Sequence, residues 1–149
     1  MARKIKIQDN NLSFKKVLTF WFPVILWTSV IFLFSAKPTP VTSEIIWQDF
    51  IVKKTAHIIE YAILATLLYR ALINSGVVKK DAGIIAIILA ILYGVSDEFH
   101  QSFTPGREPK VRDIFFDSFG ALTAVYLILN YLSRAPKIVK NWAKSLRII

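Results

Sequence analysis

The sequence has no cysteine among its 149 residues, which excludes disulfides, iron–sulfur clusters, thiolate zinc sites and a cysteine nucleophile. Acidic residues are also scarce: ten Asp and Glu face nineteen Lys and Arg, giving a formal net charge of +9. Charged residues make up 19% of the chain, below the roughly one quarter typical of soluble domains. Because 54% of the residues are hydrophobic, a disordered chain is excluded, and the length predicts a single domain.

The hydrophobic residues are gathered in four blocks. The first block, residues 17–36, contains no charge, and its twenty residues match the roughly 20 helical residues that cross a bilayer core of about 30 Å. A soluble helix would carry a polar stripe, but residues 83–95 have no charged residue on any face. We therefore predict an all-α polytopic membrane protein rather than a soluble bundle. Its expected transmembrane helices are 17–36, 56–73, 82–101 and 113–132.

The lysines and arginines are divided unequally between the two sides of this arrangement. Thirteen lie on the side of both termini and of the second connection, whereas six lie on the other side. Because positive residues favour the cytoplasmic side, we predict that both termini are cytoplasmic. The thirteen are Arg3, Lys4, Lys6, Lys15, Lys16, Arg70, Lys79, Lys80, Arg134, Lys137, Lys140, Lys144 and Arg147; the six are Lys37, Lys53, Lys54, Arg107, Lys110 and Arg112.

Two further segments have the character of the membrane interface. Residues 137–149 predict a basic amphipathic helix whose apolar stripe lies on an anionic inner leaflet. A nucleic-acid-binding tail would leave that stripe without a partner, so we expect no nucleic-acid partner. On the other side, residues 42–44 resemble a helix cap, and the hydrophobic residues at 45–51 are expected either to lie on the membrane or to form an exposed loop.

Polar residues inside the helices fall at one depth. At helical rise, His57 and Asp117 lie about 26 Å from the cytoplasmic ends of their helices, Asp97 about 24 Å and Ser35 about 28 Å. Ionisable residues in a bilayer normally face the bundle interior or water. We therefore predict one extracytoplasmic cavity, in which Gln101 shares a face with Asp97. Its ionisable members would be His57, Glu60, Asp97, Glu98, His100 and Asp117.

The loop after the third helix carries a second group of charges. Pro105 and Gly106 form a turn dipeptide, followed by Arg107, Lys110 and Arg112. Two interpretations stay open for these cations. They either hold an anionic group such as a phosphate above the cavity, or they neutralise the acidic residues beneath them, including Asp113.

Three motifs in this region resemble the VanZ-like membrane protein family, over residues from about 34 to about 129. They read Lys54-x-x-His57-x-x-Glu60-Tyr61-x-x-Leu64, then Ser96-Asp97-Glu98-x-His100-Gln101-x-Phe103-x-Pro105-Gly106-Arg107, then Asp113-x-x-x-Asp117-x-x-Gly120. The resemblance implies a small polytopic protein of the bacterial plasma membrane, associated with lowered sensitivity to teicoplanin. It adds Lys54 and Tyr61 to the candidate site, and relatives often carry Asn at the position of Asp117.

Three interpretations of the cluster remain open at the level of sequence. As an enzyme, it would use His57, Glu60, Asp97, Glu98 and His100 in acid–base catalysis on a lipid-linked or cell-wall substrate, and a metal variant of this idea has no standard ligand spacing. As a binding or transport protein, it would hold an ion, a proton or a polar head group. As a purely structural network, it would be a costly way to join helices, since interhelical hydrogen bonds contribute only about 0.6–2 kcal/mol each.

We favour a ligand site for an anionic lipid-linked or cell-wall precursor. The residues expected to bind it are Lys54, Tyr61, Gln101, Arg107, Arg112, Asp113 and Asp117. The sequence leaves the cofactor, any metal, the enzymatic activity and the oligomeric state undecided.

Overall fold

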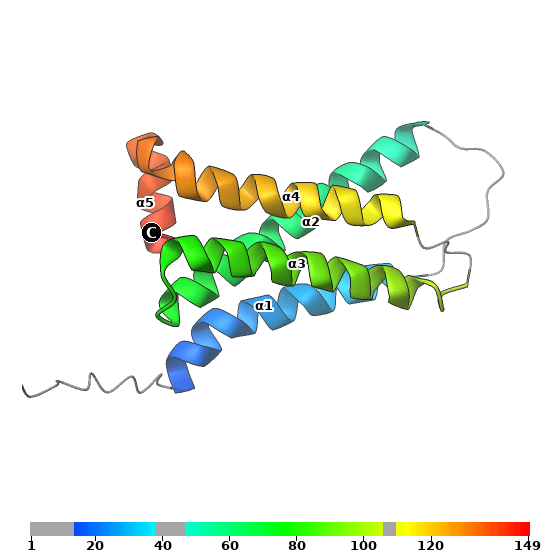
Figure 1. The fold of residues 1–149 in the computed structure, drawn as a ribbon, viewed down its shortest axis with the longest axis horizontal. Helices are drawn as coiled ribbons and strands as arrows, with labels where there is room; N and C mark the ends of the chain where they lie inside the picture. The colour runs from blue at the N-terminus through cyan, green and yellow to red at the C-terminus, as the bar shows by residue number, and fades with distance from the viewer. Residues whose placement is uncertain (1–13, 38–46, 106–109) are drawn as a thin grey trace, which may run out of the picture.

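The chain is a bundle of long helices. The computed structural model describes residues 14–37, 47–105 and 110–149, and within these ranges it contains no strand. The body consists of α1 (Phe14–Ser35), α2 (Trp47–Asn74), α3 (Lys79–Gln101) and α4 (Val111–Asn130). A short 3₁₀ turn, η1 (Leu132–Arg134), leads to α5 (Lys137–Ser145), which lies across one end of the bundle (Figure 1). The predicted all-α fold with four long apolar helices is confirmed.

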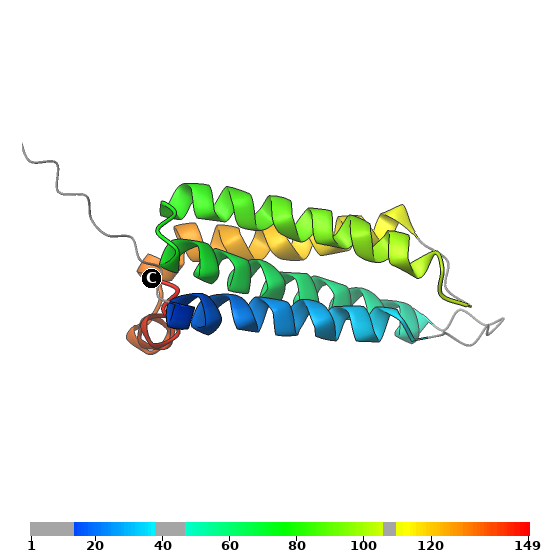
Figure 2. The ribbon, with the colours of Figure 1, turned by 90° about the horizontal axis from the view of Figure 1, so that it is seen from below.

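The two ends of the bundle differ in what they carry. Because the four long helices run up and down, the start of α1 and the last residues of the chain meet at one end (Figure 2). The opposite end carries the last turns of α1 and α3 and the first turns of α2 and α4. We call the first the terminal end, because the described chain starts and ends there, and the second the cleft end, because a polar cleft opens there.

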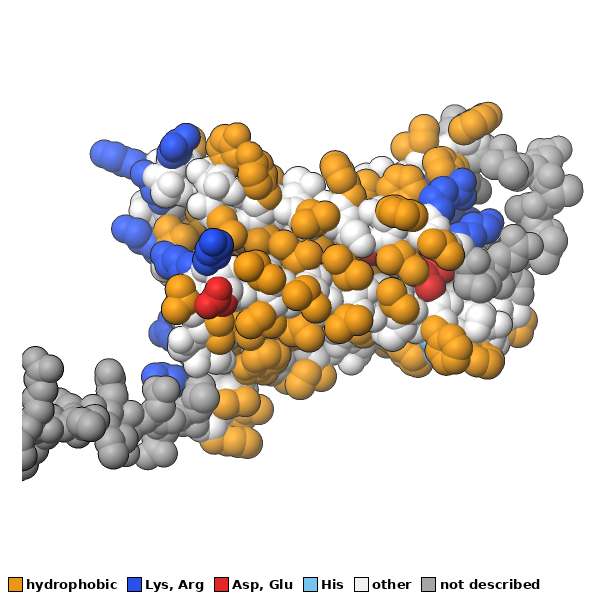
Figure 3. Space-filling model, viewed as in Figure 1, with side chains coloured by type: hydrophobic (Ala, Val, Ile, Leu, Met, Phe, Trp, Pro, Cys, Tyr) orange, Lys and Arg blue, Asp and Glu red, His pale blue; other side chains and the backbone are white. Residues whose placement is uncertain are grey.

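All four long helices are long and apolar enough to cross a membrane. Large hydrophobic side chains such as Phe22, Ile25, Leu92 and Phe119 are each more than half exposed. Figure 3 shows hydrophobic side chains over the middle of the visible face, with Lys and Arg at the two ends of the bundle. A continuous apolar surface of this extent is suited to hydrocarbon rather than to water.

Small residues allow the helices to approach one another closely. On α3, Ala82, Ala86, Ala90 and Gly94 recur every four residues and are all buried, as expected for a helix interface in a membrane. On α4, Gly120 meets α2, and a Cβ at this position would overlap with the backbone carbonyl of Ile58. Helices α2 and α4 are therefore in backbone contact close to the polar residues of the cleft end.

Helix α1 is joined to the other helices by side chains that bond to backbone carbonyls. The indole nitrogen of Trp27 donates to the carbonyl oxygen of Glu60 at 2.9 Å. The hydroxyl of Tyr93 on α3 donates to the carbonyl oxygen of Thr28 at 2.6 Å. These bonds fix the height of α1 against α2 and α3, and so set which residues of its last turn face the cleft end.

Two elements differ in length from the sequence-based expectation. Helix α2 begins at Trp47 rather than at residue 56, because Lys53 and Lys54 interrupt the hydrophobic block without interrupting the helix. Residues 47–51 are thus part of α2 and not a separate interfacial segment or loop, while residues 42–46 lie outside the described part. Helix α5 ends at Ser145, and residues 146–149 follow it as a turn and an end without regular structure.

Candidate functional site

A cleft of about 390 Å³ opens at the cleft end of the bundle. All four long helices contribute to it, which is why polar residues distant in the sequence share one space. Its lining consists of Ile31, Phe34, Ser35, Lys37, Lys53, Lys54, Ala56, His57, Glu60, Asp97, Gln101 and Asp113.

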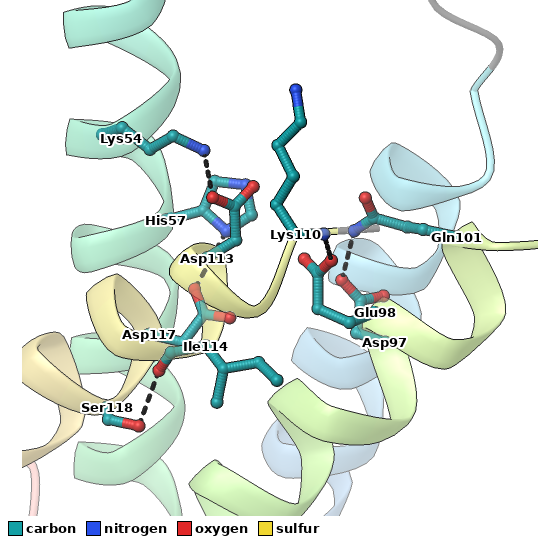
Figure 4. Close-up of polar contacts among 10 residues, drawn as sticks. All are labelled: Lys54, His57, Asp97, Glu98, Gln101, Lys110, Asp113, Ile114, Asp117 and Ser118. Carbon is teal, nitrogen blue, oxygen red and sulfur yellow. Dashed lines mark hydrogen bonds and ion pairs between the residues drawn. The ribbon is translucent and has the colours of Figure 1, made fainter. Parts of the chain in front are cut away.

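Two charged contacts join α2 to α4 at the cleft (Figure 4). The Nζ of Lys54 lies 2.5 Å from Oδ1 of Asp113, and Nδ1 of His57 lies 2.9 Å from Oδ1 of Asp117. When Asp117 is ionised, its carboxylate accepts this bond from the Nδ1–H of His57. Nε2 of His57 is not part of the contact, and His57 lines the cleft.

The acidic residues of α3 have different partners. Nε2 of Gln101 donates to Oδ2 of Asp97 at 2.9 Å, within one helix turn. The backbone N–H of Lys110, just before α4, donates to Oε2 of Glu98 at 2.7 Å. In Figure 4, Asp97, Glu98 and Gln101 stand across from the His57, Asp113 and Asp117 side chains.

Several buried polar atoms at this end have no hydrogen-bond partner in the described part of the chain. Asp97, Glu98 and Asp117 each have one unpartnered carboxylate oxygen, although the three residues are at most 5% exposed. Buried polar atoms are normally satisfied, so an unsatisfied group of this kind calls for a ligand, a proton or water. The remaining unpartnered atoms are the Ser35 hydroxyl, the Tyr61 hydroxyl and Nδ1 of His100.

Six of the residues expected from the sequence line the cleft. They come from α2, α3 and α4, and two of them, Asp97 and Asp113, are buried carboxylates on its wall. The six are Lys54, His57, Glu60, Asp97, Gln101 and Asp113.

The other expected residues lie elsewhere. Glu98 and Asp117 are buried without lining the cleft, and the fully buried Tyr61 also does not line it. The ring of His100 packs on Phe32, with centroids 4.3 Å apart. The guanidinium of Arg112 lies over the ring of Phe50 at 4.9 Å rather than over the cleft. Arg107 lies outside the described residues.

Beyond Ser35, the α1 wall of the cleft is not predictable from the sequence. Ile31 and Phe34 line this wall, and Lys37 stands at its rim. Inside a block without charges, no pattern separates lipid-facing residues from cleft-facing residues. The one usable signal was Lys37, because it is the first charge after the block.

The geometry gives no arrangement typical of a metal centre. Among the described residues, no three His, Asp or Glu side chains come together in a way that would hold an ion. The five residues of the metal variant lie apart. His57, Glu60 and Asp97 line the cleft, Glu98 is buried without lining it, and His100 packs on Phe32.

Four membrane-length apolar helices with a polar cleft at one end define a small multi-pass membrane protein. A family model described as VanZ/LLP1 matches residues 20–133, and the chain belongs to this family. The resemblance seen in the sequence motifs is thereby confirmed. No curated protein and no solved structure matches the chain.

Proposed function

We propose that the cleft opens to the extracytoplasmic side of a bacterial plasma membrane and binds an anionic, lipid-linked phosphate or cell-wall precursor. The observation that carries the proposal is the position of the cleft beside an apolar hollow of about 340 Å³ on α1. Val30 and Leu33 line the hollow, and Phe34 and Lys37 line both the hollow and the cleft. This arrangement suits a ligand with a polar head and a hydrocarbon chain.

Lysines among the cleft residues support an anionic head group. Lys54 is paired with Asp113, but Lys37 and Lys53 also line the cleft, and lysine ammonium groups bind phosphate and carboxylate. Arg107, close in sequence to this end, is the residue we expect to contact the anion, because its planar guanidinium matches two anionic oxygens at once. His57, Glu60 and Asp97 would then orient the bound group or exchange protons with it.

A second function is favoured by the buried carboxylates. Asp97, Glu98 and Asp117 each keep an unpartnered oxygen, which suits the binding or transfer of a proton or cation without further chemistry. The two functions differ in the residues they need. An anionic ligand requires the lysines and Arg107, whereas an ion or proton function requires the carboxylates alone.

The test is a growth assay under teicoplanin or another envelope stress, in a strain that depends on this protein. Four variants are each expected to weaken growth under the stress: Arg107→Lys, Lys53→Gln, Glu60→Gln and His57→Ala. Where a charge-assisted contact with the ligand is lost, the expected loss of ligand affinity is about tenfold. Asp117→Asn is expected to be milder, because an amide oxygen still accepts the Nδ1–H bond of His57.

Lys79→Gln is the matched control for Lys53→Gln, because it removes another exposed lysine from the opposite end of the bundle. Membrane abundance is measured for every variant. If all four of these variants are abundant and behave as wild type, the cluster is structural and the proposal is wrong. If Asp97→Asn impairs function while Arg107→Lys and Lys53→Gln do not, the ion or proton function replaces it.

The proposed orientation has its own test, which the absence of native cysteine makes clean. Ser102 and Ser145 are exposed at opposite ends of the bundle. In intact cells, we expect a membrane-impermeant maleimide to label Ser102→Cys and to leave Ser145→Cys unlabelled until the membrane is opened. The reverse pattern would place the cleft in the cytoplasm.

A further inference from the structure

The terminal end of the bundle is strongly cationic. Among the described residues it carries ten lysines and arginines against a single acidic residue, Asp81. Figure 3 shows part of this charge as the blue side chains at the end where α5 lies. The ten are Lys15, Lys16, Arg70, Lys79, Lys80, Arg134, Lys137, Lys140, Lys144 and Arg147.

Two of these cations share one aromatic ring. The Cζ of Arg70 lies 4.9 Å from the ring centroid of Phe20, and the Cζ of Arg147 lies 5.6 Å from the same centroid. They come from α2 and from the turn after α5, and the ring that joins them belongs to α1. Phe20 is only 3% exposed, so it fixes both guanidinium groups against the bundle.

The backbone of the C-terminal turn is fastened at the same place. Nε of Arg70 donates to the carbonyl oxygen of Leu146 at 2.5 Å, and Nδ2 of Asn74 donates to the carbonyl oxygen of Arg147 at 2.9 Å. Arg70 therefore positions the turn through its Nε atom. Among the described residues, its two terminal nitrogens form no ion pair with a carboxylate, because the ion pairs there lie at the cleft end.

Arg147 adopts a backbone conformation that normally favours glycine. Its φ is +54°, and it follows α5 in a Schellman motif. In this motif, the N–H of Arg147 donates to the carbonyl oxygen of Lys144, and the N–H of Ile148 donates to the carbonyl oxygen of Ala143. A residue with a side chain is less stable in this conformation than glycine, because its Cβ crowds the following carbonyl oxygen. Arginine at this strained position brings a second guanidinium to the ring that already holds the first, and two like charges held by one ring repel each other.

The geometry points to a binding site for the phosphate of an anionic phospholipid, formed by Arg70 and Arg147 over Phe20. A phosphate accepts bonds from both guanidinium groups and cancels their repulsion. The exposed side chains of Ile138, Val139 and Trp142 on α5 supply an apolar surface at the same end of the bundle, as expected at a bilayer interface. The site is separate from the cleft and does not depend on the function proposed for it.

The test uses the full-length protein in phosphatidylcholine nanodiscs that contain a small fraction of phosphatidylglycerol, with bound lipid counted by native mass spectrometry. We expect Arg147→Gly to retain at least about tenfold less phosphatidylglycerol than wild type. Glycine relieves the strain at φ +54°, so this variant should melt no earlier than wild type. Arg70→Gln should also lose the lipid, and Arg147→Lys should bind at an intermediate level.

The matched control is Lys79→Gln combined with Lys80→Gln, which removes two charges from the same end without touching Phe20. It should change lipid retention less than twofold. If this control loses as much phosphatidylglycerol as Arg147→Gly does, the lipid is held by the general positive charge of this end, and the proposed site is wrong. The proposed site is also wrong if Arg147→Gly retains as much lipid as wild type. Inorganic phosphate is tested in parallel, and displacement of phosphatidylglycerol by millimolar phosphate would overturn the lipid assignment.

Discussion

Asp113→Asn, with Lys54 kept, is expected to lower the free energy of unfolding by about 3–5 kcal/mol. The side chains of Lys54 and Asp113 are only 12% and 11% exposed, and their charged atoms are in direct contact. Removing one partner leaves a desolvated ammonium without a compensating charge, in addition to breaking the link between α2 and α4. Thermal or denaturant unfolding of the detergent-solubilised protein measures the effect.

The double variant Lys54→Met/Asp113→Leu distinguishes the loss of a partner from the loss of the pair. Replacing both members of a buried ion pair with apolar residues is often neutral or stabilising, so the double variant should recover most of the lost stability. Lys53→Met is the control, because Lys53 is exposed and adjacent in sequence, and it should cost less than about 1 kcal/mol. If Asp113→Asn and Lys53→Met unfold alike, the pair contributes nothing to stability.

Gly120→Ala is expected to lower the free energy of unfolding by about 1–3 kcal/mol, even though alanine is the better helix former. Its Cβ would overlap with the carbonyl oxygen of Ile58, and a backbone atom cannot rotate away as a side chain can. Helices α2 and α4 would have to separate at the level of His57 and Asp117. The same unfolding measurement, together with membrane abundance, reports the effect.

Gly83→Ala provides the comparison. There the new Cβ would meet only the ends of the Leu129 and Val125 side chains, and Leu129 is partly exposed and can move. We expect Gly83→Ala to be nearer to neutral than Gly120→Ala. The reverse order of stability would contradict the close backbone contact of α2 and α4.

The fold was predictable to the extent that hydrophobicity determines it. A block without charges, such as residues 17–36, has to become a helix in a bilayer, and counting helical rise put Ser35, His57 and Asp97 at one depth. The start of α2 was not predictable in this way. Lys53 and Lys54 end the hydrophobic block, but a helix that passes into water continues through charged residues without cost to its hydrogen bonds.

The contacts within the site were less predictable than its location. The sequence placed three cations of the 102–112 loop above the acidic residues, but Asp113 pairs with Lys54 of α2, and Arg112 lies on Phe50. Glu98 takes its hydrogen bond from the backbone of Lys110, and no sequence pattern announces a backbone donor. Which partner each side chain contacts depends on the rotation of each helix about its axis and on the reach of the side chain. The depth of a residue in the membrane depends only on its position along the helix.

The border that the cleft shares with the hollow on α1, at Phe34 and Lys37, bears on how a ligand arrives. A molecule anchored by a hydrocarbon chain moves in the plane of the membrane, and it would reach the proposed site from the side without crossing the aqueous phase. Occupancy would then follow the mole fraction of the ligand in one leaflet rather than its concentration in solution. Affinities measured in detergent, where that plane is absent, would accordingly describe a different equilibrium from the one in the cell.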